Sequence, residues 1–442
     1  MKATDFYHIH IDSCDSYFHI PSLNIISVKR GTQIDDFFRQ FVLNEHVMNH
    51  EDFSFLKREI QKELPFLVDK VFPDNLINME KHKSMQSIIL PIAGHCNLRC
   101  SYCFAQNKGN FGFNDMTEYQ VGKILDYVFS HNEKKEVCKI NFFGGEPLLN
   151  IKAIKWAVEY VRNNYPDRPV IYGITTNGTI LNADILQFIK ENNIRILLSY
   201  DGPVKLSSHR VDMHGHNWNE LIEKNINTLK EEGVKFQLRA TISSDCKSLK
   251  DIYDYFESLN IPFSAVLAYK SRNIDKACVY EGKVDFFKRE YKQLLDYYIC
   301  RLKNRLPINC YSIVNNLNCQ IKNREKNYYA CSGGINLFAI TDSGDIYSCE
   351  HFAFDKKYRI GTIDKGLYTH THKNMFPQNV DKLIGCKNCW VKYLCGGGCF
   401  SEKELTKDLY MQLDEECELK RIYWDFILKL YIASQSYRLN FE

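Results

Sequence analysis

The stretch SIILPIAGHCNLRCSYC, residues 87–103, joins a run of apolar residues to three closely spaced cysteines. Its first half is rich in isoleucine and ends at a glycine, which is the pattern of a buried β-strand. Its second half carries Cys96, Cys100 and Cys103, separated by three residues and then by two. Disulfides, a metal site and chance spacing are the three possible explanations of such a group.

The composition of the chain favours the metal site. The chain has 442 residues, 45% of them hydrophobic, so it can bury the cores of two or three domains. The net charge is only +3, from 57 basic and 54 acidic side chains, so neither nucleic acid nor a membrane surface is expected as the main partner. No secretory signal and no membrane span is expected from the apolar runs. We therefore expect a cytoplasmic protein, in which 17 reduced cysteines indicate metal ligation.

Apolar, β-rich runs alternate with helical patterns from residue 86 to about residue 300. The six runs are SIILPIAG (87–94), KINFFGG (139–145), VIYGITTNG (170–178), RILLSYDG (195–202), FQLRATIS (236–243) and FSAVLAYK (263–270). Helices are expected over 117–132, 151–165, 182–192, 217–232 and 248–259. The alternation predicts an α/β fold with a parallel sheet. Six units are too few for a closed eight-stranded barrel, so the prediction is an open, partial barrel.

Unusual loops follow the first four of these strands. The cysteine triad follows the first strand, GGEP (144–147) the second, TTNGT (175–179) the third and SYDGP (199–203) the fourth. Each loop alone would indicate only a turn. In parallel sheets of this kind, however, the loops after the carboxyl ends of the strands build the active site. The four loops together therefore predict a functional site on one rim of the sheet.

Three close thiolates can hold three corners of an iron–sulfur cube and leave one iron open. A structural zinc site would need a fourth ligand, and His95 is too close in sequence to Cys96 to complete the same tetrahedron easily. The segment CNLRCSYC (96–103) resembles the signature of the radical S-adenosylmethionine (SAM) enzymes, with Tyr102 as its aromatic residue. The resemblance implies a [4Fe–4S] cluster whose open iron binds SAM. Cleavage of SAM would then give a 5′-deoxyadenosyl radical that takes hydrogen from a substrate.

The same resemblance assigns roles to the other rim loops. The glycines Gly144 and Gly145 would let the backbone approach SAM, and Glu146 would accept a hydrogen bond from its ammonium group. On the fourth and fifth strands, Ser199 and Arg239 are expected to contact the ribose and the carboxylate of SAM. On the third loop, Thr176 and Asn177 are expected at the same rim. The alternative is that these polar residues only support the ends of the strands.

A second cysteine pattern lies near the carboxyl end of the chain. Twelve residues separate Cys331 from Gly344, Cys349 follows this glycine by five residues, and CKNCWVKYLCGGGC (386–399) and Cys417 complete the pattern. It resembles the seven-cysteine SPASM domain, which implies two auxiliary [4Fe–4S] clusters. Cys331, Cys349 and Cys399 would bind the first, and Cys386, Cys389, Cys395 and Cys417 the second. The fourth ligand of the first is open between Cys319, Cys310 and a vacant position, and a zinc ribbon is the alternative to both clusters.

The first 85 residues form a third unit. DFYHIHI (5–11), SYFHIPS (16–22) and NIISV (24–28) predict short strands, and helices are expected over 33–46 and about 51–64. This order resembles a winged-helix-like leader-recognition domain of enzymes that modify ribosomally made peptides. Such a domain binds an extended leader by adding it as a strand to a sheet edge. The alternative is an N-terminal extension that only packs on the rest of the protein.

Together these patterns resemble a radical SAM/SPASM peptide maturase with a leader module (1–85), a partial barrel (86–305) and a SPASM domain (306–442). The resemblance to maturases of Cys-rich peptides implies a thioether between a cysteine sulfur and a carbon. The expected partners are a precursor peptide and an electron donor such as flavodoxin or ferredoxin.

Several other functions share this scaffold. An anaerobic sulfatase maturase would form formylglycine. In that family an aspartate base follows the cysteine that matches Cys349, and here the residue is Glu350, which we take as the catalytic carboxylate. Enzymes that form carbon–carbon crosslinks or epimerise residues are further alternatives. A non-catalytic metal-binding scaffold is the alternative outside enzymes.

Overall fold

Six parallel strands form the centre of the computed structural model, which describes residues 5–11, 14–43, 84–104, 114–268, 280–353, 355–368, 375–405 and 413–436. They pair in chain order, as predicted. The strands are β4 (Ser87–Ala93), β5 (Cys138–Gly144), β6 (Val170–Thr176), β7 (Arg195–Ser199), β8 (Phe236–Ile242) and β9 (Phe263–Leu267). The expected α/β partial barrel is confirmed.

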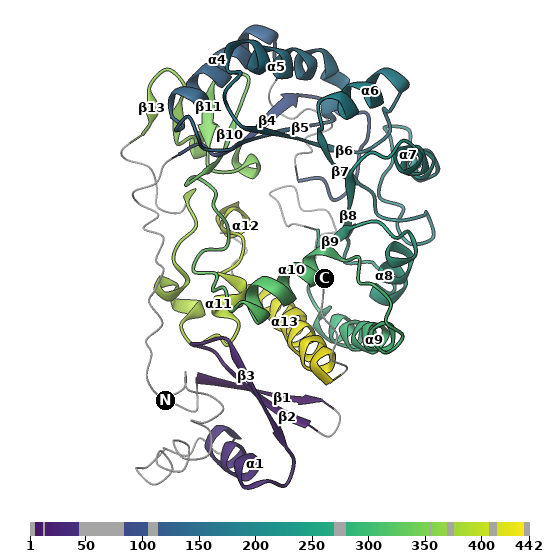
Figure 1. Cartoon of the computed structure of the whole chain (residues 1–442), viewed down its shortest axis with the longest axis vertical. Helices are drawn as coiled ribbons and strands as arrows, with labels where there is room; N and C mark the ends of the chain where they lie inside the picture. Colours follow the sequence, from purple (N-terminus) through teal and green to yellow (C-terminus); the bar gives the residue numbers. More distant parts are fainter. Residues whose placement is uncertain are drawn as a thin grey trace.

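Helices cover the outer face of the curved sheet (Figure 1). They are α4 (Glu118–Ser130), α5 (Ile151–Asn164), α6 (Ala183–Glu191), α7 (Asn219–Glu231) and α8 (Leu249–Ser258), and all five were expected. Their starts follow local chemistry. Thr117 and Gln120 form a capping box at the start of α4, and the side chains of Asn182 and Ser248 accept backbone N–H bonds at the starts of α6 and α8.

The sheet continues beyond the six strands into the Cys-rich region. Strand β10 (Leu337–Ile340) pairs in parallel with β4, and β11 (Asp345–Tyr347), β12 (Gly361–Thr362) and β13 (Gly366–Leu367) follow as antiparallel neighbours. The result is a ten-stranded sheet. The sequence analysis treated the Cys-rich region as a separate unit, whereas the structure joins it to the barrel by backbone hydrogen bonds. This pairing fixes the position of Cys349, which lies two residues after β11.

Two long helices pack against each other beside the last strand of the barrel. These are α9 (Val284–Lys303) and α13 (Leu413–Ser436). Aromatic side chains join them, with ring centroids 5.6 Å apart for Tyr291 and Phe426 and 6.2 Å apart for Tyr298 and Phe426. None of the helices in the described ranges combines the length and the apolar character that a membrane crossing requires.

The N-terminal unit is a three-stranded antiparallel sheet of β1 (Phe6–Ile11), β2 (Cys14–His19) and β3 (Asn24–Lys29). Helix α1 (Gln33–Phe38) follows and continues as a π-helical turn to Leu43. The three predicted strands are confirmed, as is the predicted 33–46 helix over its described part. The helix expected at 51–64 lies outside the described residues.

The two faces of this small sheet pack against different partners. One face forms a separate core with α1, made of Phe6, Tyr17, Ile26, Val28, Phe38 and Phe41. On the other face the ring of Tyr7 stacks on Trp390 at 3.7 Å, and its hydroxyl donates to Asp425 at 3.0 Å. Trp390 follows Cys389 in the chain, so the N-terminal sheet rests on the Cys-rich region (Figure 1).

Candidate functional site

A cavity of about 180 Å³ lies at the rim where the unusual loops were expected. It is lined by almost all of the predicted site residues of this rim: Tyr102, Gly144, Gly145, Thr176, Asn177, Ser199, Arg239, Glu350 and the cysteines Cys96, Cys100 and Cys103. Ser199 and Arg239 are register partners on the neighbouring strands β7 and β8. The shared rim predicted from the strand–helix order therefore exists as one cavity.

The environment of the three thiols fits a metal-bound state. None of the described cysteines forms a disulfide. Burial raises the pKa of the Cys96 thiol to about 12, so without a cation this thiol stays protonated at neutral pH. Donors nevertheless point at its sulfur, with the Leu98 N–H at 3.3 Å and the Asn177 amide at 3.7 Å. Three thiols on the wall of one cavity, one of them with donors to its sulfur, suit the all-sulfur ligation of an iron–sulfur cluster.

Backbone packing explains the two glycines of the GGEP loop. Gly144 has a φ of +129°, and a Cβ at Gly145 would lie 1.9 Å from the carbonyl oxygen of His95. The Gly145 N–H donates to the Ala93 carbonyl at 2.8 Å, and the Glu146 N–H donates to the His95 carbonyl at 2.9 Å. The sequence analysis assigned these glycines to an approach to SAM. The structure shows that they also let this loop press against the chain segment that positions Cys96.

Glu146 lies behind the cavity wall and joins two rim loops. Its buried carboxylate accepts from the Thr176 hydroxyl and from the Asn177 N–H, both at 2.7 Å, and from the Leu148 N–H at 3.1 Å. Burial raises the pKa of Glu146 to about 7, although these donors act in the opposite direction. The contact predicted between Glu146 and the SAM ammonium stays a prediction. The structure adds that the same carboxylate holds Thr176 and Asn177 in place.

A buried ion pair beside the triad was missed by the sequence analysis. The Arg210 guanidinium lies 3.0 Å from the Asp201 carboxylate, and both side chains are almost fully buried. The Tyr102 hydroxyl and the Thr241 N–H also donate to Asp201, and Arg210 reaches the sulfur of Cys100 at 4.0 Å. The SYDGP loop contains Asp201, but no motif marks Arg210. Its role depends on a contact between positions 110 residues apart in the chain.

Removing this arginine should destabilise the protein strongly. Arg210→Met leaves the Asp201 carboxylate buried without its cation, so we expect a loss of roughly 3–5 kcal/mol in the free energy of unfolding. The midpoint of urea unfolding measures it. Lys190→Met is the control, because Lys190 pairs with Glu232 at an exposed site and should leave the midpoint nearly unchanged. Equal midpoints for Arg210→Met and the parent would show that the pair contributes little.

The assignment of the seven cysteines of the second pattern to two ligand groups stays a prediction. Burial raises the pKa of Cys331 and of Cys349, and the charge of Cys399 adds to both shifts, so Cys399 lies near these two side chains. The other group shows the same relation, because the pKa of Cys386 is raised first by burial and then by Cys389, Cys395 and Cys417. The two cysteines considered as the fourth ligand of the first auxiliary cluster form hydrogen bonds with residues outside the seven-cysteine pattern. Cys310 is buried beside Ser312, and Cys319 donates to the Asn315 side chain.

Glu350 connects the first of these groups to the rim cavity. Its carboxylate accepts from Cys349 Sγ at 3.2 Å, and it lines the cavity together with His351. Among the described residues, Cys349, Glu350 and His351 are the only three cysteine, histidine or acidic side chains whose ligand atoms all lie within 4.8 Å of one another.

Known proteins share both the motif and the fold. Residues 90–242 match the model of the Radical SAM superfamily. The cysteine-type anaerobic sulfatase-maturating enzyme of Clostridium novyi is 26% identical over 339 residues, which cover 73% of this chain and 89% of that enzyme. The radical SAM cyclopropyl synthase TigE of Paramaledivibacter caminithermalis is 22% identical over 78% of this chain and 74% of its own length.

Solved structures agree on the fold. The structure of anSMEcpe with bound AdoMet superimposes with a TM-score of 0.65 at 22% identity, over 78% of this chain and 97% of that one. Streptococcus suis SuiB bound to precursor peptide SuiA gives a TM-score of 0.50 at 17% identity, over 91% and 96%. The superfamily match begins in β4, spans the cysteine triad and ends with β8, so it covers most of the cavity wall. The metal-binding scaffold without activity is therefore rejected, and the chain is an enzyme that carries a radical SAM domain.

Proposed function

We propose that this enzyme modifies a cysteine-containing, ribosomally made peptide by forming a thioether between the cysteine sulfur and a carbon. A relative named as a sulfatase-maturating enzyme and the structure of SuiB bound to precursor peptide SuiA support a polypeptide substrate. The observation that carries the proposal is Glu350, which lies in the rim cavity and contacts Cys349 of the second cysteine region. The same carboxylate thus borders the cavity proposed for the substrate and a cysteine proposed to bind the first auxiliary cluster.

The cofactors follow from the cysteine groups. Cys96, Cys100 and Cys103 would hold a [4Fe–4S] cluster, and Tyr102, Thr176, Asn177, Ser199, Arg239 and the glycine loop would surround SAM. SAM bound to this cluster supplies the 5′-deoxyadenosyl radical that removes hydrogen from the substrate. Two auxiliary [4Fe–4S] clusters would be held by Cys331, Cys349 and Cys399 and by Cys386, Cys389, Cys395 and Cys417. A flavodoxin or ferredoxin would supply the electrons.

The proposed reaction removes two hydrogens from the peptide. A carbon–hydrogen bond breaks and its hydrogen atom passes to the radical derived from SAM. The sulfur–hydrogen bond also breaks, and the Glu350 carboxylate accepts the proton. Formation of the carbon–sulfur bond would release one electron, which an iron–sulfur cluster held by Cys331, Cys349 and Cys399 would accept. Hydrogen, proton and electron each have a destination in or beside the cavity.

Formylglycine formation is the second candidate, because the sulfatase-maturating relative matches most of the chain and Glu350 occupies the position of that family's aspartate base. Co-expression with a short Cys-rich peptide encoded near the gene, followed by mass spectrometry, separates the reactions. A thioether loses two hydrogens and its sulfur no longer reacts with iodoacetamide. A carbon–carbon crosslink loses two hydrogens but keeps the reactive thiol. Formylglycine loses the sulfur, and epimerisation leaves the mass unchanged.

The N-terminal module is proposed to recruit the leader of the precursor at a sheet edge. We expect deletion of residues 1–83 to weaken precursor binding by about tenfold or more, equal to about 1.4 kcal/mol, and to leave SAM cleavage without peptide measurable. The deletion stops before Ser84 because Met85 is buried in the main core. Fluorescence anisotropy with labelled precursor measures the affinity.

The deletion also uncovers Trp390, which normally stacks on Tyr7. The truncated chain should therefore carry Trp390→Gln, and full-length Trp390→Gln is the matched control. If these two proteins bind the precursor with equal affinity, the N-terminal module does not recruit the leader and only packs on the rest of the protein.

A further inference from the structure

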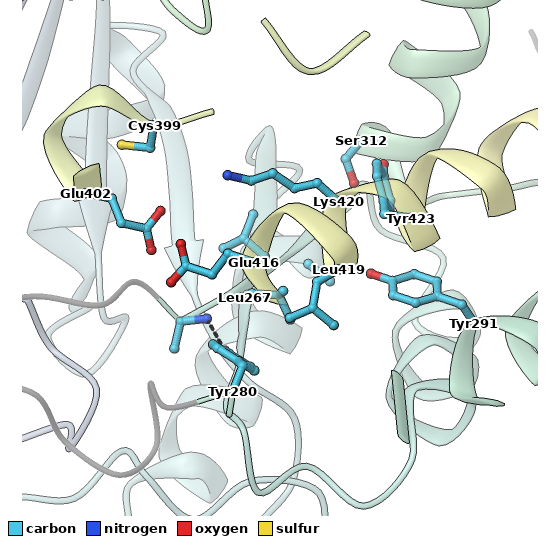
Figure 2. Close-up of a pocket in the computed structure, with 13 residues that line it drawn as sticks. Leu267, Tyr280, Tyr291, Ser312, Cys399, Glu402, Glu416, Leu419, Lys420 and Tyr423 are labelled. Carbon is cyan, nitrogen blue, oxygen red and sulfur yellow. Dashed lines mark hydrogen bonds between the residues drawn. The ribbon is translucent and has the colours of Figure 1, made fainter. Parts of the chain in front are cut away.

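A second cavity, of about 320 Å³, lies between the end of β9 and helix α13 (Figure 2). It shares Val266 and Leu267 with the rim cavity. Its lining includes Cys399 of the first auxiliary cysteine group and Lys420, which follows Cys417 of the second group by three residues on α13. The cavity therefore borders the first auxiliary group through Cys399, and Lys420, the cation on its wall, lies one helical turn from Cys417 of the second group.

The ammonium group of Lys420 packs against the glycine loop between the two cysteine groups. Gly398 has a φ of +78°, and a Cβ at this position would lie 2.7 Å from Lys420 Nζ. The positive φ favours glycine at this position, and the ammonium occupies the space beside it. The loop runs from Cys395 to Cys399, and in Figure 2 the Lys420 side chain extends from α13 toward Cys399, which immediately precedes helix α12 (Phe400–Leu405).

Lys420 lies close to a proposed ligand of each group. Its ammonium lies against Gly398, the residue before Cys399 of the first group, and both Lys420 and Cys399 line the second cavity. On α13 it follows Cys417 of the second group by three residues, which places the two side chains on one face of the helix. Lys420 therefore lies between the two sets of proposed ligands.

Other charges surround the same loop. The Lys403 ammonium donates to the Gly397 carbonyl and lowers the pKa of Cys386 and Cys417, so a second cation supports the second group. Glu402 and Glu416 oppose the lysines, and their carboxylates face each other beside Lys420 (Figure 2). Two lysines and two glutamates therefore lie beside the glycine loop.

We propose that Lys420 sets the reduction potentials of both auxiliary clusters and keeps them able to accept the electron released by the reaction. This inference rests on the proposed function, which places clusters on these cysteines. Each one-electron reduction adds a negative charge to a cluster, and a nearby ammonium in a partly buried site stabilises that charge. Lys420 acts through the clusters and not on the substrate.

The test is a redox titration, followed by electron paramagnetic resonance, of full-length protein reconstituted anaerobically with iron and sulfide. The background is Cys96, Cys100 and Cys103→Ala, so that only auxiliary clusters contribute. Lys420→Gln should shift at least one auxiliary potential to more negative values by about 59 mV, a tenfold change in the one-electron equilibrium. Lys420→Arg should restore the parent value. Lys429→Gln, on the same helix but paired with Asp425, should cause no shift.

Replacing a carboxylate beside Lys420 should shift the reduction potential in the opposite direction. Glu416→Gln removes an opposing charge and should shift the potential to more positive values, which a purely structural role would not produce. Unchanged potentials in Lys420→Gln, or a negative shift in Glu416→Gln, would overturn the inference. If Lys420→Gln fails to retain clusters, the comparison of Glu416→Gln with Lys420→Arg still decides it. Absence of auxiliary cluster signals in the background protein would instead reject the proposed function.

Discussion

Replacing Cys96, Cys100 and Cys103 by alanine is expected to abolish SAM cleavage and to remove about four of about twelve iron atoms in the reconstituted protein. Only the triad combines three thiols with the rim cavity, so no other described group can hold the SAM-binding cluster there. The two auxiliary groups are built by other segments and should keep their clusters. Iron and sulfide analysis and the release of 5′-deoxyadenosine measure the two effects.

An exposed cysteine supplies the matched control for this variant. Cys300 lies on the solvent side of α9, and Cys300→Ala should change neither the iron content nor the cleavage rate. Two results would contradict the assignment. One is SAM cleavage that survives the triple substitution, and the other is stoichiometric zinc with little iron in the parent protein.

Glu350→Gln should slow product formation by about a hundredfold or more while SAM binding and cleavage without peptide persist. The glutamine keeps the shape of the side chain but cannot accept a proton, and loss of a general base typically costs this much. The substrate thiol needs such a base, because an ordinary cysteine with a pKa of about 8.5 is mostly protonated at neutral pH. Glu350 is well placed, since it lines the rim cavity beside His351.

A metal ion is the competing way to remove that proton. If the first auxiliary cluster binds the substrate thiol directly, the metal itself lowers the pKa of the thiol. Glu350→Gln would then stay within a few-fold of the parent rate, which would reject the base role. Glu223→Gln is the matched control, because Glu223 also accepts a side-chain hydrogen bond, from Tyr200, but lies outside the cavity. Single-turnover rates with the precursor peptide separate the two outcomes.

The sequence by itself determined the fold class and most of the cavity wall. Alternation of apolar runs with amphipathic helices leaves only a parallel sheet, and in such a sheet every loop after a strand lies on the same rim. The triad, the glycine loop, Asn177 and Ser199 could therefore be placed together without any knowledge of contacts. The division of the auxiliary cysteines into two groups came from the resemblance to the SPASM domain, and it stays a prediction.

Only the tertiary structure decided the contacts between distant segments. The pairing of β10 with β4, the stacking of Tyr7 on Trp390 and the ion pair of Arg210 with Asp201 leave no local pattern. The same holds for Lys420, which reads as an ordinary helical lysine until Gly398 is seen beside its ammonium. Periodicity and spacing report on neighbours within a few turns of the chain. Side chains that meet across tens or hundreds of residues are selected by packing and charge in the folded state.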